Sequence, residues 1–445
     1  MANDVGRKVV DEYGNVFWLE ETPLARGGQG IVFRTTEGDL AIKQPTDKFG
    51  EIISNSAEAE RYRDLISRLR CLPLPSEVHI AAPRSSLRDV PGYVMKLLSD
   101  MVPFSYFNEC ADSNEIDEWS KQHPEVKLPE DEQTRGRFVR FLNSGSLRSR
   151  YRVLAKCAAE LGRLHAAGIV YGDISPGNVF MKKDATEVWL IDPDNLRLET
   201  SKGAKAVYTP QYGAPELVQE LHGGTPSSDI WAYAVMAFES LYLQHPFIGE
   251  AACSEEEAWD SDGNDLETGD GEDKAYRGLL PYIDDPEDDS NRSQGGFPRE
   301  IFSTETLRKL FYRTFGPGRT DSFIRIAAPI WAMEFARHYD ATVICPECGM
   351  TYDIANDNCP ICDAPLPTHV RLQYLDRLLV FTKPKGVDIA EYEIPERFFS
   401  PFALITNDRP AYHVEIDFRK KTLAEVRLTE RMPFMPDFTF FNLEE

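Results

Sequence analysis

The eight residues YGDISPGN (171–178) constrain the fold of this chain more than any other part of the sequence. They place Asp173 and Asn178 five positions apart, after a strongly predicted helix and before a short predicted strand, and Asp192 ends the next predicted strand. One carboxylate could lie beside an attacking hydroxyl group, while an amide and a second carboxylate are hard oxygen ligands of the kind that Mg²⁺ prefers. The pattern predicts a general base and a magnesium site on neighbouring loops.

A glycine-rich segment precedes this region and contains Gly27, Gly28 and Gly30 between two predicted strands. Glycine lets backbone N–H groups approach phosphate oxygens because no Cβ stands in the way. Lys43 closes an apolar predicted strand after this segment, where its ammonium group could reach the α- and β-phosphates of a nucleotide. Taken singly, the glycines fit a plain turn equally well, and a surface position is the default for an isolated lysine.

The next predicted helix carries two candidate partners for Lys43, which are Glu58 and Glu60. Glu58 is favoured because Leu65 and Leu69 then lie below it on roughly the same helical face. An ion pair between this helix and the strand would hold the lysine against the phosphates.

In this order and spacing, the motifs resemble the eukaryotic-type protein kinase superfamily over roughly residues 20–335. The segment GAPE (213–216), which precedes a very apolar predicted helix, is part of the resemblance. The resemblance implies an α+β, bilobal kinase-like fold, with a β-rich N-lobe over residues 1–98 and a helical C-lobe over residues 99–338. It also implies an ATP- and Mg²⁺-dependent protein serine/threonine kinase that phosphorylates a partner protein.

By that resemblance, Asp173 accepts the proton of the substrate hydroxyl, and Asn178 and Asp192 hold Mg²⁺. Met95 takes the gatekeeper position, which places the adenine-binding hinge near residues 96–98. The expected catalytic residues are Asp173, Lys43, Asn178 and Asp192, and the expected nucleotide-binding residues are Gly27, Gly28, Gly30, Val32, Ala41, Lys43, Glu58, Met95, Lys96, Leu98, Asn178 and Asp192.

The resemblance also assigns supporting roles in the C-lobe. Glu216 is expected to pair with Arg319 and so brace the helical lobe. Asp229, at the start of the apolar helix, is expected to anchor the catalytic loop.

The chain departs from the family pattern at Gly172, where the family has an arginine. That arginine usually grips a phosphate on the activation loop. Activity is therefore expected without phosphorylation of that loop, at Thr200, Ser201 or Thr209 for example.

Two more departures are Ser175, in place of the catalytic-loop lysine, and Asp-Pro-Asp (192–194), in place of Asp-Phe-Gly. With these replacements the chain resembles atypical bacterial kinases of tellurium-resistance-associated phosphorylation systems. That resemblance implies a bacterial stress or signalling system with a von Willebrand-type partner and a cognate phosphatase.

Two other functions remain open. A pseudokinase-type docking scaffold would have no need of all four of the catalytic residues named above. A small-molecule kinase is favoured by Ser175 and by Asp-Pro-Asp, but the segment YTPQYGAPE (208–216) resembles a peptide-docking platform and counts against it.

Four of the eight cysteines form two Cys-x-x-Cys pairs, which are Cys345/Cys348 and Cys359/Cys362. Two such pairs separated by ten residues suit one tetrahedral Zn²⁺, with each pair donating two thiolates. Iron in a rubredoxin-like site has the same ligand set, and redox pairs or buried thiols would also be compatible with this spacing. The spacing predicts a zinc ribbon over residues 341–367.

Composition limits the partners and the compartment. The net charge of −24 opposes binding to nucleic acid and to anionic membranes. No run of eighteen apolar residues and no apolar leader segment is present, so a cytoplasmic location is expected.

Three other segments differ in composition from the rest. Residues 105–137 are polar and are expected to loop out, and residues 250–296 form an acidic insertion with few apolar residues to bury. Residues 370–445 alternate between apolar and polar side chains, which predicts a small β-rich unit.

Overall fold

The structure is a computed structural model whose described part covers most of the chain. It comprises residues 6–27, 30–36, 38–124, 126–199, 207–221, 223–253, 271–293, 295–399, 408–420, 422–428 and 439–441. The predicted nucleotide-binding residue Gly28 and the candidate phosphorylation sites Thr200 and Ser201 lie outside these ranges.

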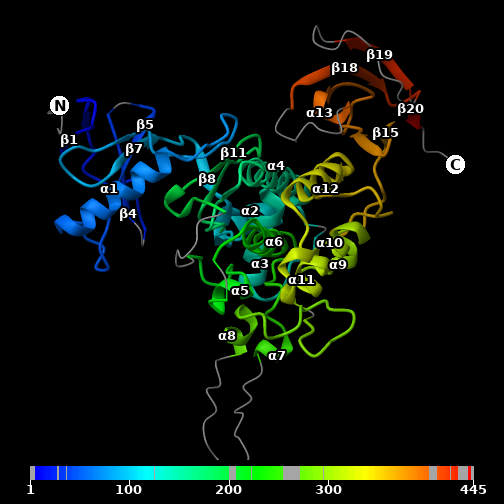
Figure 1. The fold of residues 1–445 in the computed structure, drawn as a ribbon. Helices are drawn as coiled ribbons and strands as arrows, with labels where there is room; N and C mark the ends of the chain where they lie inside the picture. Colours follow the sequence, from blue (N-terminus) through cyan, green and yellow to red (C-terminus); the bar gives the residue numbers. More distant parts are fainter. Residues whose placement is uncertain are drawn as a thin grey trace, which may run out of the picture.

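A five-stranded antiparallel sheet in the order β3-β4-β5-β7-β6 dominates the first hundred residues (Figure 1, blue). Because side chains alternate along a strand, Ile42 and Val94 face the core on one side, and Tyr93 faces α1 on the other. The helix α1 begins after Asn55, whose side chain accepts a hydrogen bond from the Ala57 N–H. The elements are β1 (Lys8–Val10), β2 (Val16–Trp18), β3 (Ala25–Gly27), β4 (Gly30–Arg34), β5 (Leu40–Pro45), α1 (Ser56–Arg70), β6 (Ser85–Ser86) and β7 (Tyr93–Lys96).

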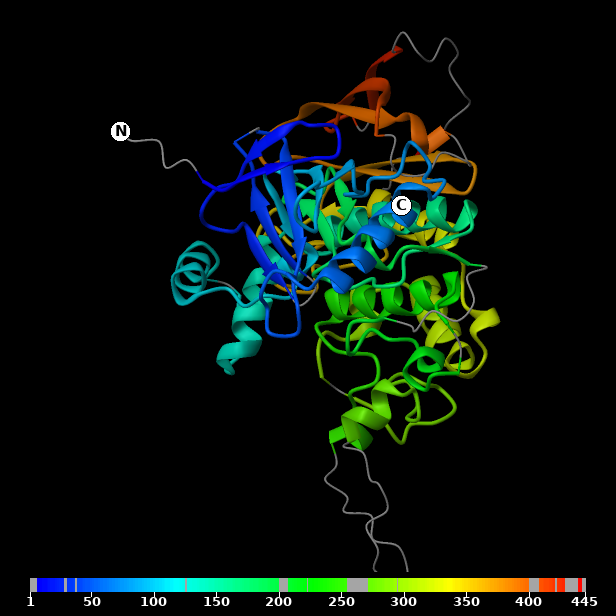
Figure 2. The same ribbon diagram turned by 60° about the vertical axis from the view of Figure 1, so that its left-hand side comes forward.

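Helices build most of the chain between residues 99 and 340, around α4, α6 and α12 (Figures 1 and 2, green to yellow). The helix α6 is apolar around nearly its whole circumference, so it is buried on all sides. None of the helices in the described residues is both long and apolar enough to cross a bilayer. The elements are β8 (Met101–Pro103), η1 (Phe104–Phe107), α2 (Ser113–Gln122), α3 (Glu132–Asn143), α4 (Ser146–Ala166), β9 (Ile169–Val170), β10 (Val179–Lys182), β11 (Val188–Leu190), η2 (Pro193–Asn195), β12 (Arg197–Leu198), α5 (Pro215–Val218), α6 (Pro226–Tyr242), α7 (Glu250–Cys253), α8 (Gly271–Tyr276), α9 (Arg299–Phe302), α10 (Glu305–Phe315), α11 (Pro317–Thr320), η3 (Ser322–Ile324) and α12 (Ala328–Asp340).

The polar segment 105–137 does not loop out, contrary to the expectation from its composition. It forms α2 and the start of α3, and Trp119 on α2 is buried. Asp112 and Glu115 form a capping box at the start of α2, with each side chain bonded to the backbone N–H of the other residue. Some of the polar residues that suggested a loop are therefore helix caps.

The acidic segment is packed at several positions that the structure describes. Tyr282 and Ile283 are buried, and the Asn291 side chain donates to the carbonyl oxygens of Phe247 and Pro281. The expectation of too little burial is therefore wrong around Tyr282, Ile283 and Asn291, whereas residues 286–290 are exposed. Residues 254–270 lie outside the described part.

A short hairpin of β13 (Thr342–Ile344) and β14 (Thr351–Asp353) carries the first cysteine pair, Cys345/Cys348, in its turn, and the second pair, Cys359/Cys362, follows it. Val343, Met350 and Tyr352 are fully buried in the same hydrophobic core as α4 and α12. This hairpin therefore shares its core with the helices.

Two three-stranded antiparallel sheets complete the chain, in the orders β16-β15-β20 and β17-β18-β19 (Figure 1, orange and red). They enclose a hydrophobic core of their own, which includes Leu372, Tyr412 and Ile416. The α+β organisation and the small C-terminal sheets that the sequence predicts are thereby confirmed. The elements are β15 (His369–Tyr374), β16 (Arg377–Thr382), β17 (Ile389–Pro395), α13 (Glu396–Phe399), β18 (Pro410–Asp417), β19 (Thr422–Leu428) and β20 (Thr439–Phe441).

A buried ion-pair network joins these sheets to the helices. Arg397 on α13 contacts both carboxylate oxygens of Asp340, at the end of α12, at 2.7 and 2.8 Å. Asp408, which precedes β18, accepts from Arg397, and also from Arg152 and Lys156 on α4. The C-terminal sheets are therefore fixed to two of the helices at the chain's centre.

Candidate active site

Lys43 lies on β5, on the side of the sheet that faces α1, and is 5% exposed. Its strand neighbours are Val32 on β4 and Tyr93 on β7. Gly30 lies beside it, where a Cβ atom would fall 2.7 Å from the Gln44 carbonyl oxygen and 3.2 Å from the Lys43 Cε. A residue with a Cβ atom would fit there only if the backbone shifted. Glycine therefore lets β4 pack closely against the lysine side chain.

Asp173 lies in the loop after β9 and is 7% exposed. Its carboxylate accepts hydrogen bonds from the Thr209 hydroxyl at 2.7 Å and from the Asn178 side chain at 3.1 Å. Burial raises the pKa of Asp173 above its ordinary value, and the bond from Thr209 opposes that shift. The carboxyl group is thus buried and oriented, as a proton acceptor must be.

The loop that carries Asp173 is held by Asp229 at the start of α6. The Asp229 carboxylate accepts hydrogen bonds from the backbone N–H groups of Tyr171 and Gly172, both at 2.8 Å, and from His165 at 2.9 Å. The anchoring role expected for Asp229 agrees with this geometry.

Gly172 has a φ of +88°, in the left-handed region that favours glycine. A Cβ atom there would approach the Asn195 carbonyl oxygen to 3.1 Å. Glycine adopts this backbone without strain, which is compatible with the departure from the family pattern at this position.

Asn178 and Asp192 offer the oxygen ligands of the candidate magnesium site. The Asn178 Nδ2 atom donates to the backbone carbonyl and to the carboxylate of Asp173, which keeps the amide Oδ1 as the ligand atom. Asp192 follows β11 with a φ of +55°, and its side chain is about one-fifth exposed. This donor set fits a hard divalent cation.

Two carboxylates contact the Lys43 ammonium group. The Nζ atom lies 2.5 Å from Asp192 Oδ1 and 2.8 Å from Asp194 Oδ2. Burial alone would lower the pKa of Lys43, but the charges of Asp194 and Asp192 outweigh burial and raise it, so the side chain is a cation.

The predicted pair between Lys43 and Glu58 is wrong for this structure. Glu58 is exposed on α1, as is the alternative Glu60, and the buried positions of that helix include Ala59 and Tyr62. The Tyr62 hydroxyl donates instead to Asp194 at 3.4 Å. Sequence reasoning gave Asp194 no part in the site, although the unusual Asp-Pro-Asp spacing was a visible signal.

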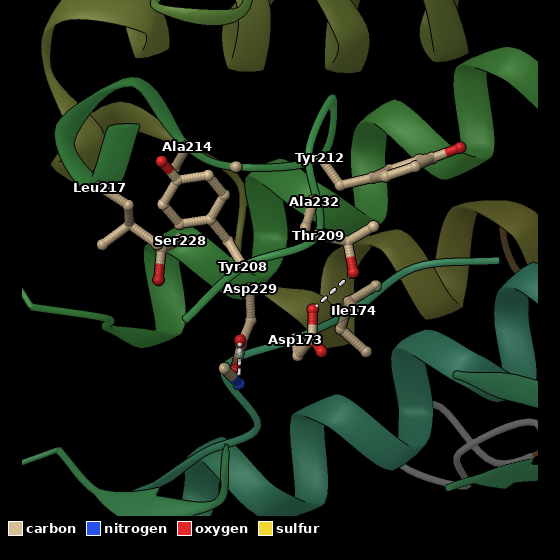
Figure 3. A pocket seen from close by; sticks show the side chains of 12 residues that line it. Asp173, Ile174, Tyr208, Thr209, Tyr212, Ala214, Leu217, Ser228, Asp229 and Ala232 are labelled. Atoms are coloured by element: carbon tan, nitrogen blue, oxygen red, sulfur yellow. Dashed lines mark hydrogen bonds between the residues drawn. The ribbon is translucent and has the colours of Figure 1, made fainter. Parts of the chain in front are cut away.

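Thr209 comes from the segment before α5 and lines a small pocket with Asp173, Tyr212 and Asp229. Figure 3 shows the Thr209 hydroxyl directed at the Asp173 carboxylate, while the Tyr212 ring points away toward α6. The Tyr212 hydroxyl donates to Glu239 on α6 at 2.5 Å. The pocket thus lies between the loop of Asp173 and the segment that resembles a peptide-docking platform.

Glu216 pairs with Arg325, and the prediction of Arg319 as its partner is wrong. The Arg325 guanidinium group contacts both oxygens of Glu216, at 2.7 and 2.8 Å, and is almost fully buried. Arg319 donates to the Gly278 carbonyl oxygen instead. The two arginines are only six positions apart in sequence, and only the tertiary fold selects between them.

The remaining predicted nucleotide-binding residues lie on neighbouring strands or at a strand end. Ala41 on β5 is opposite Met95 on β7, on the same face of the sheet as Lys43. Lys96 ends β7 with its Nζ atom 3.9 Å from the ring centre of Trp189, and Leu98 follows. Their contacts with a nucleotide stay a prediction.

The four cysteines Cys345, Cys348, Cys359 and Cys362 come together, and all their sulfur atoms lie within 4.8 Å of one another. In a tetrahedral site with Zn–S bonds of about 2.3 Å, sulfur atoms are about 3.8 Å apart. The first cysteine turn is closed by a bond from the Cys345 N–H to the Met350 carbonyl oxygen. The cluster suggests a closed zinc site, distant in sequence from the site of Lys43 and Asp173.

Comparison with known proteins identifies the region of the catalytic loop. Residues 137–267 match the family described as the protein kinase domain. Ribosomal protein S6 kinase alpha-1 of Rattus norvegicus is 37% identical over 101 residues, which cover 22% of this chain and 13% of that protein. Ribosomal protein S6 kinase 2 alpha of Xenopus laevis is 36% identical over 101 residues, which cover 22% and 13%. Myotonin-protein kinase of Mus musculus is 30% identical over 111 residues, which cover 22% and 17%. The chain therefore spans less than a fifth of the length of these relatives.

Proposed function

From the premise that this chain contains a protein kinase domain with distant similarity to serine/threonine kinases, we propose that it transfers the γ-phosphoryl group of ATP to a serine or threonine of a partner protein. The observation that carries the proposal is the hydrogen bond from Thr209 to Asp173. It links the carboxylate of the catalytic loop to the segment that would receive a peptide. A substrate hydroxyl bound there would lie beside a buried proton acceptor.

Each residue of the site has a separate role in the proposed reaction. Lys43 binds phosphate oxygens of ATP, and Asp173 orients the substrate hydroxyl and accepts its proton. Asn178 and Asp192 would hold Mg²⁺, which neutralises the charge of the phosphates when it is bound. Gly30 lets the backbone of β4 lie close to the nucleotide.

Two other functions are weighed against this one. A docking scaffold without catalysis would not need an oriented Asp173. The Asp173 carboxylate accepts hydrogen bonds from side chains of three different segments. A small-molecule kinase would not need the segment from Tyr208 to Glu216, which Arg325 fixes to the helical core.

The biological setting follows only from the resemblance to kinases of tellurium-resistance-associated systems. On this resemblance, we propose that the protein acts in a bacterial stress or signalling system. A von Willebrand-type protein is then the expected substrate and a phosphatase the expected antagonist.

Incubation with labelled ATP and Mg²⁺, alone and with candidate partner proteins, tests the proposed function. We expect label on a serine or threonine of a protein, identified by mass spectrometry. Label on a small molecule alone would show a small-molecule kinase. Nucleotide binding without transfer to any acceptor would show a docking scaffold.

We also predict that the enzyme is active without a phosphorylated activation loop. Gly172 provides no guanidinium group to bind such a phosphate, so treatment with a phosphatase should leave most of the initial rate. The rate is measured before and after the treatment on the same preparation. A large loss that returns with phosphate at Thr200, Ser201 or Thr209 would contradict the prediction.

A further inference from the structure

Asp194 lies at the centre of a buried polar cluster whose donors come from three elements. Its Oδ2 atom accepts from Lys43 on β5 at 2.8 Å and from the Tyr62 hydroxyl on α1 at 3.4 Å. Its Oδ1 atom accepts from the Tyr93 hydroxyl on β7 at 3.2 Å. The side chain is 8% exposed. No part of the proposed reaction yet uses this carboxylate.

We propose that Asp194 is the residue that positions Lys43 toward the phosphates of ATP, in place of a glutamate on α1. The proposal rests on the proposed function, because it concerns the same nucleotide site. Asp194 is a positioning residue in this account, since it acts through Lys43 and has no contact with the substrate.

Lys43 needs a permanent anionic partner because its ammonium group is buried on a flexible stem of four carbons. Asp192 also contacts Lys43, but it is one of the two side chains expected to hold Mg²⁺. An anchor that is shared with a metal would release the lysine whenever the metal binds. The Asp194 side chain is more buried than that of Asp192. Its carboxylate can therefore stay in contact with Lys43 when the metal binds.

The two tyrosines fix the orientation of Asp194. The rings of Tyr62 and Tyr93 are stacked, with their centres 6.4 Å apart. Their hydroxyl groups donate to different oxygens of the carboxylate, so both oxygens are held while Oδ2 also accepts from Lys43. An oriented carboxylate holds an ammonium group in one place better than a freely rotating one.

The helix α1 therefore contributes a neutral hydroxyl group to the lysine site. Glu58 is exposed on that helix. A shift of α1 would remove the Tyr62 bond, but it would leave the ion pair between Asp194 and Lys43 in place. The ion pair that positions the lysine therefore involves no residue of α1, and α1 only helps to orient the carboxylate through Tyr62.

The test is a double-mutant cycle on Lys43 and Asp194 in the full chain, with Glu58→Gln as the matched control. Asp194→Asn keeps the shape and removes the charge, and it should lower kcat/KM for ATP roughly 10- to 100-fold, the value of one charge-assisted hydrogen bond. Glu58→Gln should stay within about twofold of the wild type, because an exposed carboxylate contributes little. If Glu58→Gln lost as much as Asp194→Asn, the assignment would be overturned.

The cycle separates positioning from a merely structural role. In a Lys43→Met background, Asp194→Asn should cause no further loss, because it acts only through the lysine. Equal losses in both backgrounds, together with a lowered melting temperature, would show that Asp194 only supports the fold.

The variants Tyr62→Phe and Tyr93→Phe provide a second test if Asp194→Asn does not fold. Each should lower kcat/KM less than Asp194→Asn does, and no loss in either would count against the proposal.

Nucleotide binding makes the test independent of the acceptor protein. The wild type and the three variants of the cycle are titrated with ATP and Mg²⁺, and the dissociation constants should show the same non-additive pattern. If the wild type binds ATP in this pattern but transfers phosphate to nothing, the proposed function fails and the role of Asp194 stands. If transfer occurs but the pattern is additive, the role of Asp194 fails alone.

Discussion

Asp173→Ala should lower kcat roughly 10²- to 10⁴-fold, the range for removal of a positioned general base. The affinity for ATP should stay close to that of the wild type, because Asp173 contacts Thr209, Asn178 and Asn195 and not Lys43. The measurement is kcat with a purified protein substrate, with nucleotide affinity determined separately. Asp173→Asn is the control that keeps the shape of the side chain, and it should be nearly as slow.

Asp192→Ala should lose activity for a different reason than Asp173→Ala. It should also abolish transfer, but by weakening the binding of ATP with Mg²⁺, because the variant loses a metal ligand and a partner of Lys43. Near wild-type turnover by Asp173→Ala would show that the general base has been assigned to the wrong residue.

Cys345→Ser should abolish stoichiometric metal binding and destabilise the hairpin of β13 and β14. Closed four-thiolate sites are structural, and in isolated zinc modules the metal supplies about 10–16 kcal/mol of binding free energy. The wild type should contain one Zn²⁺ per chain by elemental analysis. The variant should be cut by protease within residues 345–362 and should melt at a lower temperature.

Cys71→Ser is the matched control, because Cys71 is exposed and lies far from the cluster in sequence. It should keep both the metal and the melting temperature. The hairpin shares a core with α4, so we expect the loss of metal to loosen the start of that helix, while nucleotide binding near Lys43 survives. Disulfides among the four cysteines in the wild type, with no metal, would contradict the zinc assignment.

The order and spacing of motifs predicted on which kind of element several candidate site residues lie. The positions of Asp173 and Asn178 in one loop and of Asp192 after the next strand are local features, and the structure has them there. Lys43 lies on a strand as predicted, but within β5 and not at its end. The alternation of residues 370–445 likewise predicted the C-terminal sheets, because a period of two is a property of the strand itself.

The partners of these side chains could not be predicted in the same way. The prediction placed Glu58 on the same helical face as Leu65 and Leu69. The structure buries Tyr62, Ile66 and Leu69, as expected, but leaves Leu65 half-buried at the margin of that face. Glu58 lies at the same margin, where a small rotation of the helix decides whether a side chain is buried or exposed, and the structure leaves it exposed. Helical periodicity alone does not resolve such a rotation in a face with several apolar residues.

Pairings across the fold depend on distances that no local pattern contains. Arg325 and not Arg319 reaches Glu216, because the chain turns between them at η3. The C-terminal network of Arg397, Asp340 and Asp408 was missed for the same reason. Its members are far apart in sequence and meet only when both parts have folded.

The backbone at Gly172 makes an arginine costly to introduce at this position. A mutation to arginine would restore the side chain, but at a φ of +88° a residue with a Cβ atom costs about 1–2 kcal/mol, and its Cβ would crowd the Asn195 carbonyl oxygen. An arginine would therefore be accommodated only with this strain and with a small shift of the Asn195 carbonyl group. A guanidinium group that binds a phosphate would be gained with less strain at a position whose φ is negative.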